Sequence, residues 1–172
     1  MRGFPATIRH KVQFHQGKAI EAFLDEFFRN DGWQIEPTTA YEERALCLGD
    51  RHFAREGFDC LVEYKSGLQT FYTGNVFLET ISVDTQRKPG WVFTCRADFI
   101  FYAALLNGKI LIFRPNRLRA QIDTLRRQFR EVATGHDQND GYRTHGLLVP
   151  LAFAEQHLAA KVIENVAPER TG

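Results

Sequence analysis

The chain has 172 residues, of which 44% are hydrophobic, and a formal net charge of +1. This length and composition suit one compact domain and exclude a chain that is disordered over most of its length. No apolar run approaches the ~20 residues that a membrane-spanning helix needs. The near-neutral charge does not by itself indicate a nucleic-acid-binding protein. The cysteines Cys47, Cys60 and Cys95 are widely spaced, which predicts neither a zinc site nor a disulfide and favours a reducing cytoplasm.

The first half of the chain predicts one helix followed by strands. Residues 17–30 carry apolar side chains at helical spacing, and the polar run Asn30-Asp31-Gly32 ends the helix. Short segments rich in apolar and β-branched residues, bounded by turn residues, then predict strands. Four such strands are expected, over 33–39, 44–50, 58–65 and 75–82. The polar segment 51–57 would connect the second and third of them.

The second half predicts helices and strands in alternation. Three helices are expected, over 94–107 with Thr94 as N-cap, over 116–132 and over 154–163. Two strands are expected, over 109–113 and 146–153, and a loop over 133–145. The order predicts an α/β fold with a mixed central β-sheet flanked by α-helices, in a single domain over 1–172. The core would span roughly 16–132, and the tail 167–172 would be flexible.

The stretch "FDCLVEYKSG" (58–67) places chemistry on one face of a predicted strand. Asp59, Glu63 and Lys65 would face one side, because side chains alternate along a strand. Asp50, from the preceding predicted strand, would approach Glu63 if the two strands form a hairpin. Two carboxylates and the Tyr64 backbone carbonyl suit Mg²⁺ or Mn²⁺, and Lys65 could act on an attacking water. The alternative is an ordinary solvated strand face, since short motifs match by chance.

The order of these features resembles the PD-(D/E)XK nuclease superfamily, and most of all its small Holliday-junction resolvases and related phage or plasmid nucleases. The resemblance covers roughly residues 16–114. It implies a restriction-endonuclease-like core, with the motif residues at Asp50, Glu63 and Lys65. Glu21 in "KAIEAFLDEFF" stands where the family's first helix supplies a glutamate. The segments "TGNVFLET", "PGWVF" and "CRADFIFY" match further features of phage-type members, and the first of them contains Glu79.

Two departures keep alternatives open. Gly49 stands where many members carry a proline before the motif aspartate. A second alignment would use Asp59 as the motif aspartate and Glu79 as the motif acid, but Ile81 would then occupy the lysine position. We favour the first alignment because it supplies every chemical group, and we keep Asp59 and Glu79 as candidates for additional metal ligands. A charge at Glu79, on an otherwise apolar strand face, requires a partner.

A basic segment lies farther along the chain. Seven basic residues and a single acid, Asp123, fall between Lys109 and Arg130. Such a surface could contact nucleic-acid phosphates, or it could be the solvated face of a helix. The candidate nucleic-acid-binding residues are Arg119, Arg126, Arg127 and Arg130.

Together, the residues and the resemblance imply a Mg²⁺- or Mn²⁺-dependent endonuclease that cuts DNA, with branched DNA as a candidate substrate. The expected location is the cytoplasm, without a membrane, and a homodimer is a candidate assembly. Two alternatives remain: an inactive relative that binds nucleic acid, and a protein-interaction accessory factor of phage or plasmid type. The near-neutral charge favours these alternatives, whereas the presence of Lys65 favours the enzyme.

Overall fold

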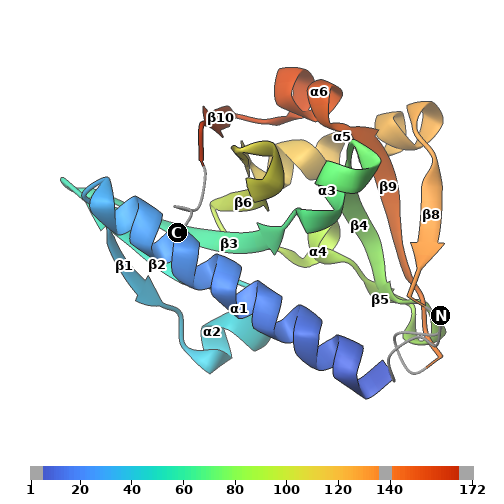
Figure 1. Cartoon of the computed structure of the whole chain (residues 1–172). Helices are drawn as coiled ribbons and strands as arrows, with labels where there is room; N and C mark the ends of the chain where they lie inside the picture. The colour runs from blue at the N-terminus through green and yellow to red at the C-terminus, as the bar shows by residue number, and fades with distance from the viewer. Residues whose placement is uncertain (1–5, 136–140, 167–172) are drawn as a thin grey trace, which may run out of the picture.

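A computed structural model describes the backbone of residues 6–135 and 141–166, with side chains from residue 16 onward within these ranges. The chain forms two sheets and several helices (Figure 1). The strand order is β1-β2-β3-β6-β7-β10 in the six-stranded sheet and β5-β4-β9-β8 in the four-stranded sheet. The predicted mixed α/β fold with a mixed central sheet and flanking helices is therefore confirmed, and the second sheet was not predicted.

The six-stranded sheet is the central layer. Its strands are β1 (Gln34–Pro37), β2 (Arg51–Arg55), β3 (Phe58–Ser66), β6 (Phe99–Ala104), β7 (Lys109–Phe113) and β10 (Lys161–Glu164). Neighbouring strands are antiparallel except β3 and β6, which are parallel. The strands of the four-stranded sheet are β4 (Asn75–Val83), β5 (Lys88–Pro89), β8 (Glu131–Thr134) and β9 (Thr144–Pro150), all antiparallel to their neighbours.

One long helix and several short ones accompany the sheets. They are α1 (Ala6–Asn30), α2 (Ala40–Arg44), α3 (Leu68–Thr73), α4 (Trp91–Thr94), α5 (Pro115–Gln128) and α6 (Leu151–Phe153). A π-helical turn (Ala154–Leu158) follows α6, and within the described residues short 3₁₀ helices cover Asp84–Gln86 and Leu105–Asn107. None of the helices in the described part of the chain is long and apolar enough to cross a membrane.

Helix α1 covers one face of the six-stranded sheet (Figure 1). Its buried stripe of Ile20, Leu24 and Phe28 packs with residues of β2, β3 and β6. The helix starts earlier than predicted but ends where the sequence indicates. Gly32 follows it with φ +88°, a backbone conformation that side chains disfavour.

The opposite face of the six-stranded sheet packs on the four-stranded sheet and on α5. Leu118, Ile122 and Leu125 form the apolar stripe of α5 and are buried in this second core. The central sheet is thus covered on both faces. A polar side chain on either covered face must therefore have a hydrogen-bonding or charged partner, or lie where solvent reaches it.

The predicted helix over 94–107 is wrong. The segment forms the short helix α4, the strand β6 and a 3₁₀ turn. Five of the six residues of β6 are buried, because the strand lies between both cores and pairs with β3 and β7. A strand that is buried on both faces reads as a continuous apolar run, which periodicity cannot distinguish from a buried helix.

The predicted strand over 44–50 is also wrong. A capping box between Thr39 and Glu42 starts helix α2, which extends to Arg44. The strand that pairs with β3 is β2, in the segment expected to be a polar connection. Only Phe53 of β2 is buried, so its polar composition concealed it.

The C-terminal predictions need three corrections. Helix α5 ends at Gln128, and Val132 lies in β8. The predicted strand over 146–153 is β9, which starts at Thr144 and ends at Pro150. The predicted last helix is the π-helical turn followed by β10. Residues 136–140 of the predicted loop and the predicted flexible tail lie outside the described residues.

Candidate active site

The β2–β3 hairpin brings Asp50 to Glu63. Glu56 and Gly57, both with positive φ, form the two-residue turn of the hairpin. Arg51 pairs with Val62, so Asp50 stands opposite Glu63 just before β2 begins. The Asp50 N–H donates to the Val62 carbonyl (2.8 Å), and Asp50 Oδ2 accepts a hydrogen bond from the Tyr64 N–H (2.7 Å). These two bonds fix the carboxylate of Asp50 at the edge of β3.

Gly49 makes this approach possible. Its φ is +97°, and a Cβ at this position would lie 2.6 Å from the Val62 carbonyl oxygen. No side chain fits there without moving the backbone. A glycine at position 49 is therefore required by the local geometry in this chain.

Glu63 and Lys65 do not lie on an ordinary solvated face. The ammonium of Lys65 contacts Glu63 Oε1, and only 28% and 17% of the respective side chains are exposed. Both side chains point away from α1, toward the layer that contains the four-stranded sheet, because their neighbours Val62 and Tyr64 face α1. The sequence predicted this common face correctly.

Glu79 joins the group from the other sheet. It lies on β4, is half-buried, and accepts a long hydrogen bond from the Trp91 N–H (3.4 Å). Gly90 lets the backbone approach, since a Cβ there would lie 2.3 Å from the Glu79 carbonyl oxygen. The partners that the sequence required for Glu79 are the Trp91 N–H, the Ser82 side chain and, through its charge, Lys65. Glu79 and Lys65 come from different sheets, so this electrostatic interaction could not be read from strand spacing.

The electrostatics of the cluster show an excess of negative charge. Burial, and then the charge of Glu63, raises the pKa of Asp50 to about 6. Burial also raises the pKa of Glu79, although Lys65 opposes the shift. Burial alone would lower the pKa of Lys65, but Glu63, Asp50 and Glu79 outweigh it and the pKa is raised. Lys65 is therefore a charged ammonium that neutralises only part of the negative charge around it.

Glu21 approaches the cluster from the other face of the sheet. Its carboxylate binds Arg51 Nη2 (3.1 Å) and Lys18 Nζ (2.9 Å), and its charge reaches Asp50. Arg51 also binds Asp25 (2.9 Å). The charge of Glu21 thus acts on Asp50, but the partners that its carboxylate contacts are cations of α1 and β2.

Sequence reasoning missed the Arg51–Asp25 pair. Asp25 also accepts a hydrogen bond from the Tyr64 hydroxyl (3.1 Å), so it ties α1 to the strand that carries Glu63. Two signals were present: Asp25 falls one helical turn after Glu21, and Arg51 follows Asp50 directly.

Asp59 is placed elsewhere. It lies four residues before Glu63, which is about 13 Å along a strand. Its carboxylate binds His52 Nε2 (2.8 Å), and 63% of its side chain is exposed. His52 lies in β2. The geometry thus separates Asp59 from the group formed by Asp50, Glu63 and Lys65.

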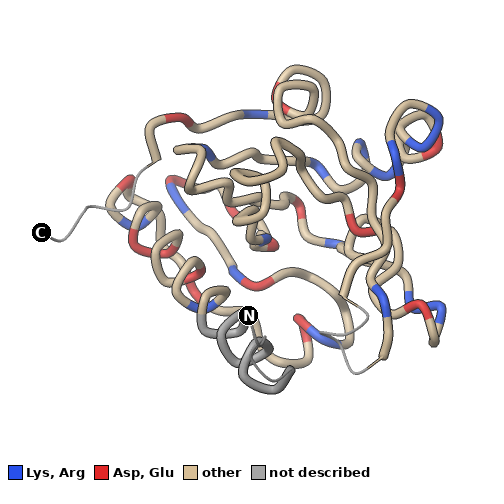
Figure 2. The backbone as a smooth tube through the Cα atoms, turned by 45° about the vertical axis from the view of Figure 1, so that its right-hand side comes forward, with Lys and Arg blue, Asp and Glu red and all other residues tan. Residues whose placement is uncertain are grey.

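The four candidate nucleic-acid-binding arginines differ in their surroundings. Arg119 donates to the backbone carbonyls of Val92 (3.2 Å) and Cys95 (2.8 Å), which ties α5 to α4. Arg126 lies 3.6 Å from Asp123 and 3.8 Å from Glu131. Arg127 bonds to Thr124 and remains exposed, as does Arg130. Figure 2 shows basic positions recurring along α5, but three of these four side chains, those of Arg119, Arg126 and Arg127, have partners within the protein.

The donor set suits a hard divalent cation in its chemistry. Asp50 and Glu63 supply carboxylate oxygens. The Tyr64 carbonyl lies on the same edge of β3 as the Tyr64 N–H, which donates a hydrogen bond to Asp50. In the arrangement of the described side chains, however, no three His, Cys, Asp or Glu groups converge as a metal site. Lys65 instead takes the place of a cation against Glu63. A bound ion would therefore require Glu63 or Lys65 to shift.

Comparisons with family models, with curated proteins and with solved structures find no match. The fold and the site define a mixed α/β protein that has a half-buried cluster of carboxylates and one lysine between its two sheets.

Proposed function

We propose that the chain is a Mg²⁺- or Mn²⁺-dependent DNA endonuclease with a restriction-endonuclease-like core. One observation carries this proposal: Lys65 lies half-buried among carboxylates of β3, β4 and the segment before β2. A purely structural surface does not need several acids gathered around one cation at the junction of two sheets. Sites that hydrolyse phosphodiesters need both carboxylates for a hard cation and a positioned cationic group.

Each residue of the cluster would have its own role in the reaction. A divalent cation held by Asp50, Glu63 and the Tyr64 carbonyl would supply an activated water. Lys65 would orient that water or stabilise the charge that develops on the phosphate. Glu79 would hold the ammonium of Lys65 in place while Glu63 is engaged elsewhere. Glu21 would add negative charge next to Asp50 and hold Arg51 against α1.

The chain order adds support. Helix α1 with Glu21, strand β1 after Gly32-Trp33, and the hairpin β2–β3 with the acid-x-lysine follow one another as the resemblance implies. The six-stranded sheet then continues with a strand parallel to β3. The proposal includes DNA as the substrate, a preference for branched DNA and a homodimeric assembly.

A catalytically inactive relative that binds nucleic acid or a protein partner is the second candidate. The observation that favours it is the Lys65–Glu63 contact, which uses a proposed metal ligand for an internal ion pair. In such a protein the cluster would stabilise the junction of the two sheets and perform no chemistry.

An activity panel separates the two candidates. Purified protein is incubated with linear duplex, single-stranded and four-way-junction DNA in Mg²⁺, in Mn²⁺ and in EDTA. The nuclease predicts cleavage only with a divalent cation, and loss of cleavage in Glu63→Gln. The exposed Glu36 provides a matched control, since Glu36→Gln should cut at the wild-type rate. Absence of cleavage in every condition, or equal cleavage by Glu63→Gln, would reject the proposal.

A further inference from the structure

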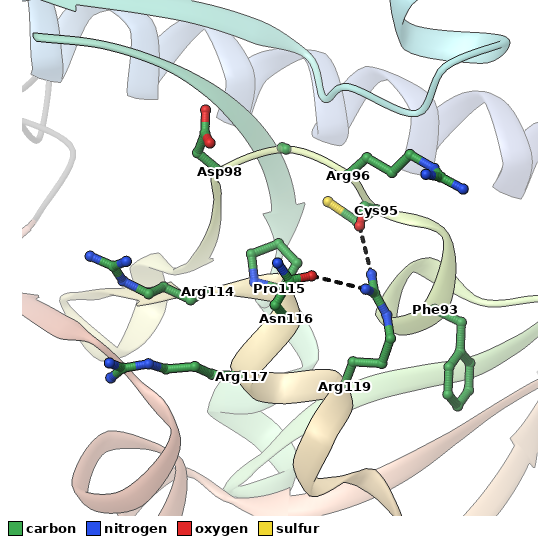
Figure 3. Close-up of a pocket in the computed structure, with 10 residues that line it drawn as sticks. Phe93, Cys95, Arg96, Asp98, Arg114, Pro115, Asn116, Arg117 and Arg119 are labelled. Carbon is green, nitrogen blue, oxygen red and sulfur yellow. Dashed lines mark hydrogen bonds between the residues drawn. The ribbon is translucent and has the colours of Figure 1, made fainter.

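A polar pocket lies beside the candidate active site. It has a volume of about 530 Å³ and lies between the segment 93–98 and the first turn of α5 (Figure 3). Its lining contains four arginines, Arg96, Arg114, Arg117 and Arg119. Arg114, Arg117 and Arg119 belong to the basic segment between Lys109 and Arg130, whereas Arg96 lies outside that segment and was not predicted to join them.

The arginines have two different roles. Arg119 forms part of the wall, because it donates to the carbonyls of Val92 and Cys95 and to Asn116 Oδ1 (3.0 Å). Arg96, Arg114 and Arg117 are exposed, and within the described residues none of them pairs with a carboxylate. Arg114 lies over the Phe99 ring, 5.3 Å from its centre. The three positive charges are therefore not neutralised by carboxylates within the described residues.

One acid lies in the pocket. Asp98 Oδ2 accepts a hydrogen bond from the Leu61 N–H (2.8 Å), so part of its charge is already used by the protein. The first turn of α5 contributes further positive character, since the N–H groups of Asn116 and Arg117 have no partner within the helix. The lining as a whole thus favours an anion.

The arrangement favours an extended polyanion over a single small anion. Figure 3 shows Arg114 and Arg117 extending side by side toward one end of the pocket, while Arg96 extends toward the opposite end. Guanidinium groups bind phosphate oxygens in a bidentate manner. Cations that flank a pocket at both ends match successive phosphates of one strand better than one phosphate in its centre.

The pocket borders the cluster of Asp50, Glu63 and Lys65. Asp98 binds the backbone of Leu61, which precedes Glu63 by two residues on the same face of β3. Two residues correspond to about 7 Å along a strand. Cys95 is close to both the pocket and Glu63. It lines the pocket, and the charge of Glu63 helps burial to raise the pKa of its thiol. A strand in the pocket would therefore pass close to Lys65.

We infer that this pocket, through Arg96, Arg114 and Arg117, holds the phosphodiester backbone of one nucleic-acid strand next to the phosphate presented to Lys65. The inference rests on the proposed function for the identity of the neighbouring phosphate. Its binding part depends only on the pocket.

The test measures binding without cleavage. Fluorescence anisotropy follows a dye-labelled single-stranded DNA oligonucleotide, in EDTA, at several salt concentrations. The variant Arg96→Glu, Arg117→Glu should lose about 10-fold or more in affinity, and the magnitude of its salt slope should fall by about 1.4, which is about 0.7 for each single-strand phosphate contact removed. The matched control Arg44→Glu, Lys161→Glu changes the charge equally at exposed sites and should lose much less. Thermal melting confirms that both variants fold.

Three outcomes would overturn the inference: no loss in the pocket variant, an equal loss in the control, or a loss confined to Arg126→Glu, Arg130→Glu. The last would place the strand at the other end of α5. The outcome is independent of catalysis. A protein that cuts DNA while its pocket variant binds normally keeps the proposed function and loses the inference, and a protein that binds through the pocket without cutting does the reverse.

Discussion

Lys65 is a charged lysine in a mostly buried position, where lysines are seldom found without a partner of opposite charge. Its side chain is mostly buried, and the acids around it belong to separate elements of the fold. Exposed Glu-x-Lys pairs on strands contribute little to stability or function. The burial and the surrounding carboxylates are what distinguish this pair from such an ordinary one.

Lys65→Met tests the role of the ammonium. The methionine keeps the length of the side chain but removes the charge, so the cleavage rate should fall by ~10²-fold or more. The carboxylates lose their cation, which should lower the free energy of unfolding by about 1–3 kcal/mol. Lys65→Arg keeps the charge and should retain stability while it loses rate. Lys161→Met, at an exposed site, should alter neither by more than ~0.5 kcal/mol. Cleavage by Lys65→Met at the wild-type rate would remove Lys65 from the mechanism.

The raised pKa of Asp50 predicts a pH dependence of stability. Its ordinary value of 3.8 applies to the unfolded chain, and the value in the fold is about 6. Folding therefore favours the protonated form, and its contribution is full below about pH 4 and lost as the pH rises to about 6. In Asp50→Asn, which can still accept the Tyr64 N–H, the melting temperature relative to wild type should rise across this interval. Melting curves in EDTA measure it, and a difference that does not change with pH contradicts the shift.

At the scale of elements, the segment before β2 depends on Gly49. Gly49→Ala should lower the free energy of unfolding by about 3 kcal/mol or more, since it adds a backbone clash to an unfavourable positive φ. Gly57 is the matched control, because it also has positive φ but open space around it. Gly57→Ala should cost only about 1–2 kcal/mol. Denaturant unfolding of both variants compares them, and equal costs would mean that the close approach of Gly49 to β3 is not needed.

Sequence patterns predicted elements well where one face is solvated. The stripe of α1, the alternation of β3 and the start of β1 all follow from a clear contrast between polar and apolar positions. The patterns failed at β6, which has no polar face, and at β2, which has almost no apolar one. In each case, tertiary neighbours and not local residues decide the structure.

At the scale of the whole molecule, the candidate site lies at the junction of the two sheets. The sequence predicted by strand alternation that Glu63 and Lys65 share a face, and it expected Asp50 to approach Glu63 through a hairpin, although it assigned the pairing strand to 44–50 instead of β2. It could not bring the charge of Glu79 to bear on Lys65, or Arg96 and Arg114 into the lining of one pocket, because these residues belong to elements that are distant along the chain. The second sheet, which closes the site from one side, was likewise beyond local patterns.

The central claim is that the carboxylates at this junction form a site for a divalent cation. Calorimetric titration with Mn²⁺ near neutral pH tests it without any assay of activity. The wild type should bind Mn²⁺ and Asp50→Asn should lose most of that binding. Asp59→Asn should bind as the wild type does, because Asp59 pairs with His52 away from the cluster. A wild type that binds no Mn²⁺, or a loss of binding in Asp59→Asn but not in Asp50→Asn, would contradict the claim.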